Sequence, residues 1–141
     1  MPGTSEVDFW ELDGQYLSQV AGEAITLGLV VAVGATDGNV IVGTASHTKP
    51  LGVAIAGYRT SRTATDNAVA SGSKVTVATR GVVNLTSASA ITRGEYVECG
   101  AAGTVQTATL SAVADWSKVL GMALSTVTAG SLTVKVKLMR G

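Results

Sequence analysis

The 141-residue sequence predicts an all-β protein, a small β-barrel or sandwich built from two duplicated β-units behind an extended N-terminal arm. Two observations support this fold class. Apolar and polar residues alternate in short runs along the chain, as in half-buried strands. In addition, three short sequence blocks occur in the same order in both halves. Two copies are too few for a solenoid, so we expect the halves to close on each other around one core.

The alternation is clearest in residues 72–81 and returns in residues 130–141. Every second side chain of an extended strand points to the same face. The positions that share the expected core face are Val75, Val77 and Thr79 in the first segment and Val134, Val136 and Leu138 in the second.

The other two repeated blocks are shorter. Residues 24–28 (Ala-Ile-Thr-Leu-Gly) match residues 90–94 (Ala-Ile-Thr-Arg-Gly), and residues 50–55 (Pro-Leu-Gly-Val-Ala-Ile) match residues 119–124 (Val-Leu-Gly-Met-Ala-Leu). We therefore divide the chain into an arm and a body with two repeats. The expected bounds are 1–20 for the arm, 21–141 for the body, about 22–81 for repeat one and about 88–141 for repeat two.

The remaining elements follow from strand and turn chemistry. A long strand from Ile25 to Val33 is followed by Asp37-Gly38-Asn39, a hairpin signal. Gly52 within the next strand indicates a bulge or a close backbone approach. Further strands are expected over 40–42, 51–55, 82–85, 95–98 and 104–107, with a hairpin at 100–103 and a short helical stretch at 111–116. We expect Trp116 in the core, with a contact to a neighbouring protein as the alternative.

Charged residues make up only 14% of the chain. Because the solubility of a free monomer depends largely on charge, this composition indicates that little surface stays in water or that much of it lies against other protein. Ordinary variation in composition is the alternative.

The first 23 residues carry five acidic side chains and no Lys or Arg, so an acidic arm precedes a mildly basic body. The ten basic residues are scattered singly, which argues against nucleic acid as a partner. Phe9, Trp10 and Tyr16 crowd into this arm, and large side chains in a segment without its own core find burial elsewhere. They contact a neighbouring protein, or Phe9, Trp10 and Leu12 fold back over one end of the body.

Repeat one has an insertion over residues 57–71 that repeat two lacks. It is polar and contains Tyr58, Arg59 and Arg62, which we predict as a contact loop because duplicated folds place contacts in such insertions. A disordered surface loop is the alternative.

The motifs of catalysis and cofactor binding are not found in the sequence. The one histidine, His47, stands in a loop without a nearby ligand or nucleophile, and we expect it at the surface. Phosphate loops, dinucleotide fingerprints and paired metal-ligand spacings are missing, so we predict no enzyme, no cofactor and no metal. Glu95 and Glu98 are expected on opposite faces of a strand, and Cys99 in the core.

The chain begins without the positive start and apolar stretch of a secretory signal, and its longest apolar run is too short to span a membrane. We therefore expect a soluble product made in the cytoplasm, with no membrane partner.

The ordered set of blocks resembles the capsid decoration, or cement, proteins of tailed double-stranded DNA phages. The residues that carry the resemblance are 21–25, 50–54, 74–81, 90–94 and 120–124. The resemblance implies a small β-barrel that forms a homotrimer on the outside of the head, bound between subunits of the major capsid protein, where it reinforces the expanded shell. The acidic arm and the insertion depart from the family pattern.

On this interpretation the arm, through Glu6, Asp8, Phe9, Trp10, Leu12 and Tyr16, joins a capsid subunit or an adjacent trimer, as an added strand joins a free sheet edge. Two other interpretations stay open. A tail, baseplate or surface-layer subunit shares the β-rich, weakly charged profile. A carbohydrate-binding module would use Trp10, Tyr58 and Trp116 for stacking on sugars.

Overall fold

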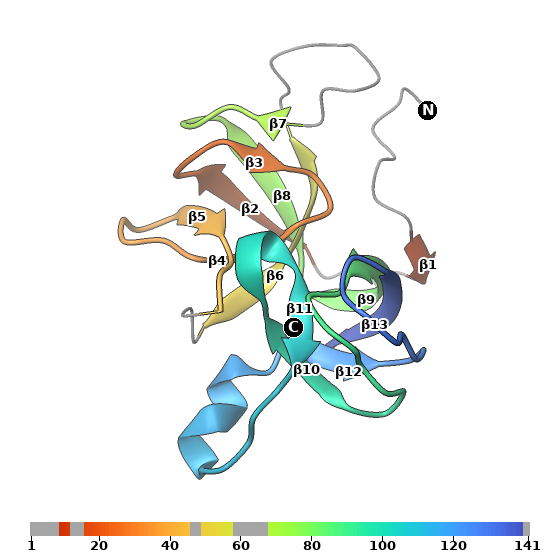
Figure 1. Cartoon of the computed structure of the whole chain (residues 1–141). Coiled ribbons are helices and arrows are strands. Elements are labelled where there is room, and N and C mark those ends of the chain that lie inside the picture. The colour runs from red at the N-terminus through yellow and green to blue at the C-terminus, as the bar shows by residue number, and fades with distance from the viewer. Residues whose placement is uncertain (1–8, 12–15, 46–48, 58–67, 140–141) are drawn as a thin grey trace.

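The computed structural model describes residues 9–11, 16–45, 49–57 and 68–139, and it confirms the all-β fold (Figure 1). Its strands form a closed five-stranded barrel, a six-stranded sheet and a small two-stranded sheet. Within these residues no helix is long and apolar enough to cross a membrane.

The first unit, residues 16–78, contains the closed barrel, in which strands follow the order β2-β5-β4-β6-β8. A separate pair, β3 and β7, lies beside it. The strands are β2 (Tyr16–Ala21), β3 (Ile25–Thr26), β4 (Val30–Val33), β5 (Asn39–Val42), β6 (Pro50–Gly57), β7 (Ala68–Val69) and β8 (Lys74–Ala78). The predicted hairpin at Asp37-Gly38 is confirmed, because β4 and β5 pair antiparallel across it.

The second unit, residues 80–139, forms the six-stranded sheet together with β1 (Phe9–Glu11), in the order β1-β9-β13-β12-β10-β11. Its elements are β9 (Arg80–Thr86), β10 (Tyr96–Cys99), the short 3-10 helix η1 (Ala101–Gly103), β11 (Val105–Thr107), the 3-10 helix η2 (Val113–Lys118), β12 (Gly121–Ala123) and β13 (Thr133–Met139).

The two units repeat the same strand pairing, which confirms the predicted duplication. In the first unit β4 pairs with β5 and β6, and β8 pairs with β6 and β2. In the second, β10 pairs with β11 and β12, and β13 pairs with β12 and β9. The parallel contact of β2 with β5 is matched by a bridge between Ser87 and Val105, and the β3–β7 pair by a bridge between Ile91 and Val127.

Each unit begins with a strand that lies upstream of the repeated blocks. Residues 16–20, which the sequence analysis assigned to the arm, form most of β2 and pair along β8. Residues 80–86 form β9, which holds the equivalent place beside β13.

Gly52 and Gly121 show why the block at residues 50–55 is repeated at residues 119–124. A Cβ atom at Gly52 would collide with the backbone carbonyl oxygen of Ala78, and one at Gly121 with that of Lys137. Each glycine therefore allows the close strand approach that the sequence predicted for Gly52.

One continuous apolar core runs through both units. It includes Cys99, which is buried as predicted. A Cβ atom at Gly43 of the first unit would meet the Sγ atom of Cys99, and one at Gly103 of the second would meet Leu29. The units therefore pack directly on each other, and the Gly103 amide donates a hydrogen bond to the Gly43 carbonyl (2.7 Å).

Candidate functional site

The structure describes some of the residues predicted as contacts and not others. Glu6, Asp8, Leu12, Tyr58, Arg59 and Arg62, as well as His47, lie outside the described residues. Phe9 and Trp10 belong to β1, and Tyr16 begins β2 with 47% of its surface exposed.

The β1 strand pairs antiparallel with β9 of the same chain. Phe9 is opposite Val83 and Glu11 is opposite Val82, with an irregularity between the two pairs. The backbone of β1 thus folds back onto the body of its own chain, while Leu12 lies outside the described residues. An extended segment that joins a sheet through its main chain is also the way in which strands pass between proteins.

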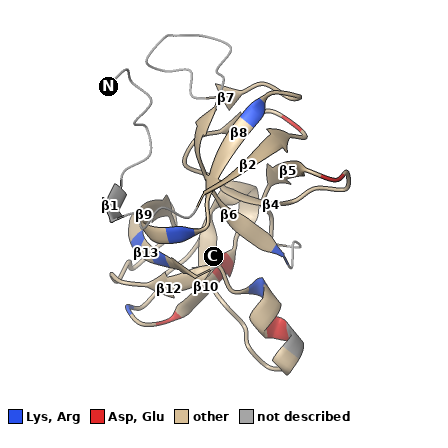
Figure 2. Ribbon diagram, turned by 180° about the vertical axis from the view of Figure 1, so that it is seen from behind, with Lys and Arg blue, Asp and Glu red and all other residues tan. Residues whose placement is uncertain are grey.

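A second feature is η2, which stands away from the strands in both ribbon views (Figures 1 and 2). Val113 is 89% exposed and Trp116 is 51% exposed. The prediction of a core Trp116 is therefore wrong, because the helix extends beyond the sheet and leaves much of the indole in solvent. The indole ring packs edge-on against Tyr96 of β10, with ring centroids 5.1 Å apart. We call Val113, Trp116 and Tyr96 the η2 tip.

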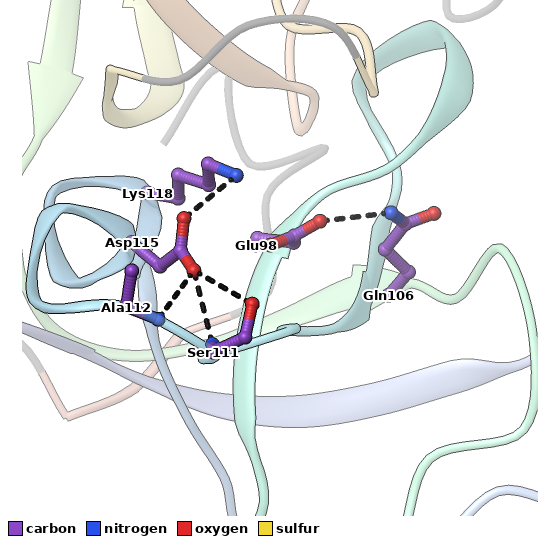
Figure 3. Close-up of polar contacts among 6 residues, drawn as sticks. All are labelled: Glu98, Gln106, Ser111, Ala112, Asp115 and Lys118. Carbon is purple, nitrogen blue, oxygen red and sulfur yellow. Dashed lines mark hydrogen bonds and ion pairs between the residues drawn. The ribbon is translucent and has the colours of Figure 1, made fainter.

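Asp115 holds η2 in place (Figure 3). Its Oδ2 atom accepts hydrogen bonds from the backbone amides of Ser111 (3.0 Å) and Ala112 (2.9 Å) and from the Ser111 hydroxyl (3.2 Å). Its Oδ1 atom lies 3.1 Å from the Nζ atom of Lys118. The Lys118 side chain and then these two amides hold the pKa of Asp115 below its usual range.

Among the described residues of the first unit, none forms a helix equivalent to η2. The β5 and β11 strands are followed by the equivalent residues Gly43 and Ala108, whose amides donate to the carbonyls of Val30 in β4 and Tyr96 in β10. From there the next shared residue is Leu51, eight positions on, in the first unit and Leu120, twelve positions on, in the second. This difference in spacing, four residues longer in the second unit, is the sequence signal of the insertion that carries η2.

The carboxylates of the second unit serve the fold separately. The Glu95 Oε1 atom accepts from the Thr92 amide (2.7 Å) and the Thr107 hydroxyl (3.2 Å). The Glu98 Oε2 atom accepts from the Gln106 side chain (3.0 Å; Figure 3). Over the described ranges, no three His, Cys, Asp or Glu side chains gather in a way that could hold a metal ion. Figure 2 shows the charged residues spread over both units.

The surface thus offers strand edges and an apolar tip, which are means of binding other proteins. Residues 4–138 match the family model described as "Structural cement protein (E217 gp24/Pam3 gp6)". The chain belongs to this family. A structural role in the phage capsid, and a place in the virion, follow from that membership.

A solved structure shares the fold of this cement protein. It is the N base of the head fibre protein gp8.5 of bacteriophage phi29, with a TM-score of 0.57 and 19% sequence identity. The match covers 89% of this chain and 94% of the fibre base. The search of curated proteins found no match.

Proposed function

We propose that this cement protein binds the outer surface of the expanded phage head as a homotrimer and stabilises the lattice of the major capsid protein. The observation that carries the proposal is the family match over nearly the whole chain. The same match favours the head over a tail, baseplate or surface-layer location.

The surface chemistry supports a role in protein contacts. The Trp116 indole of the η2 tip is half exposed, and Asp115 fixes the helix that carries it. Tryptophan side chains often contribute most of the binding energy at interfaces, so Trp116 is suited to contact another protein. The role needs no catalytic centre, and we propose that the protein is not an enzyme.

Three segments supply the contacts in this proposal. The arm, with Glu6, Asp8, Phe9, Trp10 and Leu12, reaches a capsid subunit or an adjacent trimer, and its carboxylates face basic residues there. The loop with Tyr58, Arg59 and Arg62 contacts a neighbouring chain of the trimer or the shell. The η2 tip meets the shell. Because the three contacts of a trimer act together, each can be weak while the whole binds tightly.

The direct test adds purified protein to expanded empty heads of the same virus that lack it. We expect saturable binding, counted as copies per head by quantitative gel analysis, and a higher temperature of head disruption. Unexpanded heads are the control and should bind less. Protein that stays in the supernatant with expanded heads contradicts the proposal.

A further inference from the structure

Over its first residues, one edge of β2 has no partner among the strands that the structure describes. On one side β2 pairs with β8 from Tyr16 to Val20. On the other side, β5 reaches only Val20 and Ala21. Among the described strands, none lies beside residues 16–18 on the β5 side.

The backbone of β2 presents hydrogen-bonding groups along this free edge. The Val20 amide donates to Gly38, at the start of β5, whereas the Ala21 amide donates to Ser73, on the β8 side. Because the direction of backbone groups alternates along a strand, Ser18 and Tyr16 point the same way as Val20. Their N–H and C=O groups therefore face this edge, where the Ser18 carbonyl also accepts a hydrogen bond from the Gln19 side-chain amide (3.1 Å). The main-chain groups of Leu17 and Gln19 serve the β8 ladder.

The internal duplication identifies the equivalent edge on β9. The amides of Ala21 and Ser87 donate to matching carbonyls, those of Ser73 (2.9 Å) and Leu132 (2.8 Å). The next amides, of Gly22 and Ala88, likewise donate to Val40 and Val105. Counting back along both strands from Ala21 and Ser87, Leu17 matches Val83 and Tyr16 matches Val82.

The two equivalent edges differ in what covers them. On β9 this position is occupied by β1, which pairs with Val82 and Val83. Val83 is fully buried, whereas its counterpart Leu17 is 40% exposed. The edge of β2 is thus a strand-binding site whose equivalent in the same chain is filled.

The described strands and the proposed function together indicate which protein pairs with the β2 edge. Among the residues that the structure describes, each chain has one β1 and two equivalent edges. If β1 of one copy pairs with β2 of another, the β9 edge that it leaves loses its partner. One edge per chain then still has no described strand beside it. In the proposed function, on which this inference rests, the protein against which every chain lies is the major capsid protein, which makes the shell the source of the additional strand.

We propose that residues 16–18 of β2 accept an extended segment of the major capsid protein as an antiparallel strand. The main-chain groups of Tyr16 and Ser18 provide the hydrogen bonds. The incoming segment places an apolar or aromatic residue opposite Leu17, as Phe9 lies opposite Val83. This site is separate from the β9 edge that β1 occupies, so the shell strand and β1 bind at the same time.

The variant Ser18→Pro tests the proposal, because it removes an edge-facing N–H and leaves the β8 ladder of Leu17 and Gln19 in place. Ala90→Pro, at an exposed position between β9 and β10, is the matched control. We expect Ser18→Pro to weaken binding to expanded heads roughly tenfold or more. The control should bind as the natural protein does, and thermal melts show that both variants are folded.

Hydrogen exchange on the natural protein gives a second, independent reading. The amides of Tyr16 and Ser18 should exchange rapidly in free protein and slowly on heads. Equal binding of Ser18→Pro, or unchanged exchange of these amides on heads, overturns the strand site while the cement function stands. Protection already present in free protein also overturns it, because the edge is then filled without the shell. Natural protein that does not bind heads at all instead contradicts the proposed function.

Discussion

Gly28 and Gly94 hold the same place in the two units of this cement protein. Their φ angles are 96° and 93°, in the left-handed region that favours glycine. The Gly28 amide donates a hydrogen bond to the Ala54 carbonyl, and the Gly94 amide donates one to the equivalent Ala123 carbonyl. The nitrogen–oxygen distance is 2.8 Å in both. Two turns that end the same sequence block are therefore built identically.

This equivalence predicts equal stability losses. Gly28→Ala and Gly94→Ala should each lower the free energy of unfolding by about 1–2 kcal/mol, because alanine is strained at these φ angles. Gly28→Asn and Gly94→Asn are the controls, and should lose less since asparagine tolerates the left-handed region. Denaturant titration measures all four. A large loss at one glycine and none at the other would argue against equivalent turns.

Low pH should loosen the η2 tip. The folded pKa of Asp115 lies below that of an unfolded aspartate, about 4, so its stabilisation is complete above that value. The stabilisation is lost as the pH falls through the lowered folded pKa. In a Trp10→Phe background the fluorescence of Trp116 should change in this acidic range. The same step in Asp115→Asn would show that another group is responsible.

The η2 tip should be a strong contact for the shell. Trp116→Ser should weaken binding to expanded heads roughly thirtyfold, the effect of losing an interface hot spot. Val33→Ser changes a side chain that is similarly exposed (54%) on β4 and should have little effect. Sedimentation of each variant with heads measures the affinity. Equal affinities for the two variants would remove the tip from the interface.

The arm should contribute to head binding without being needed for the fold. A chain lacking residues 1–11 keeps all of β2 and should still unfold in one cooperative transition. Its occupancy on expanded heads should fall roughly tenfold, and the binding that remains should depend less on salt because the arm's carboxylates are gone. Full occupancy by the shortened chain would dispose of an arm contact.

The arginines of the predicted contact loop should hold the trimer together. By light scattering the natural protein should have the mass of three chains, and the double variant Arg59→Ala/Arg62→Ala should have the mass of one. Arg93→Ala, an exposed arginine in a turn of the second unit, should stay trimeric. An unchanged mass of the double variant would place the trimer contact elsewhere.

The sequence alone was enough for the fold class and the duplication. The blocks at Ile25 and Ile91, and at Gly52 and Gly121, are repeated because the turns and close strand approaches require particular residues. The strand over 82–85 was predicted, but residues 16–20 of β2 were assigned to the arm. The equivalence of β2 and β9 was missed, since their contacts are main-chain hydrogen bonds that accept different side chains, such as Leu17 in β2 and Val83 in β9.

The interaction surfaces were harder to predict. A tryptophan in a weakly charged β protein is usually buried, but Trp116 lies on a short insertion beyond the strands of the six-stranded sheet. Its ring contact among the described residues is with Tyr96. The free edge of β2 depends on which strands meet in space. A single sequence does not contain that information.

Electron cryomicroscopy of the virus's expanded heads, with and without this protein, tests the central claim most directly. We expect density on the outside of the shell, at threefold positions between major capsid subunits, into which three copies of the two-unit body fit. Heads without the protein should lack that density. Density for the body at the tail or baseplate, or an outer surface that is the same with and without the protein, would contradict a cement function.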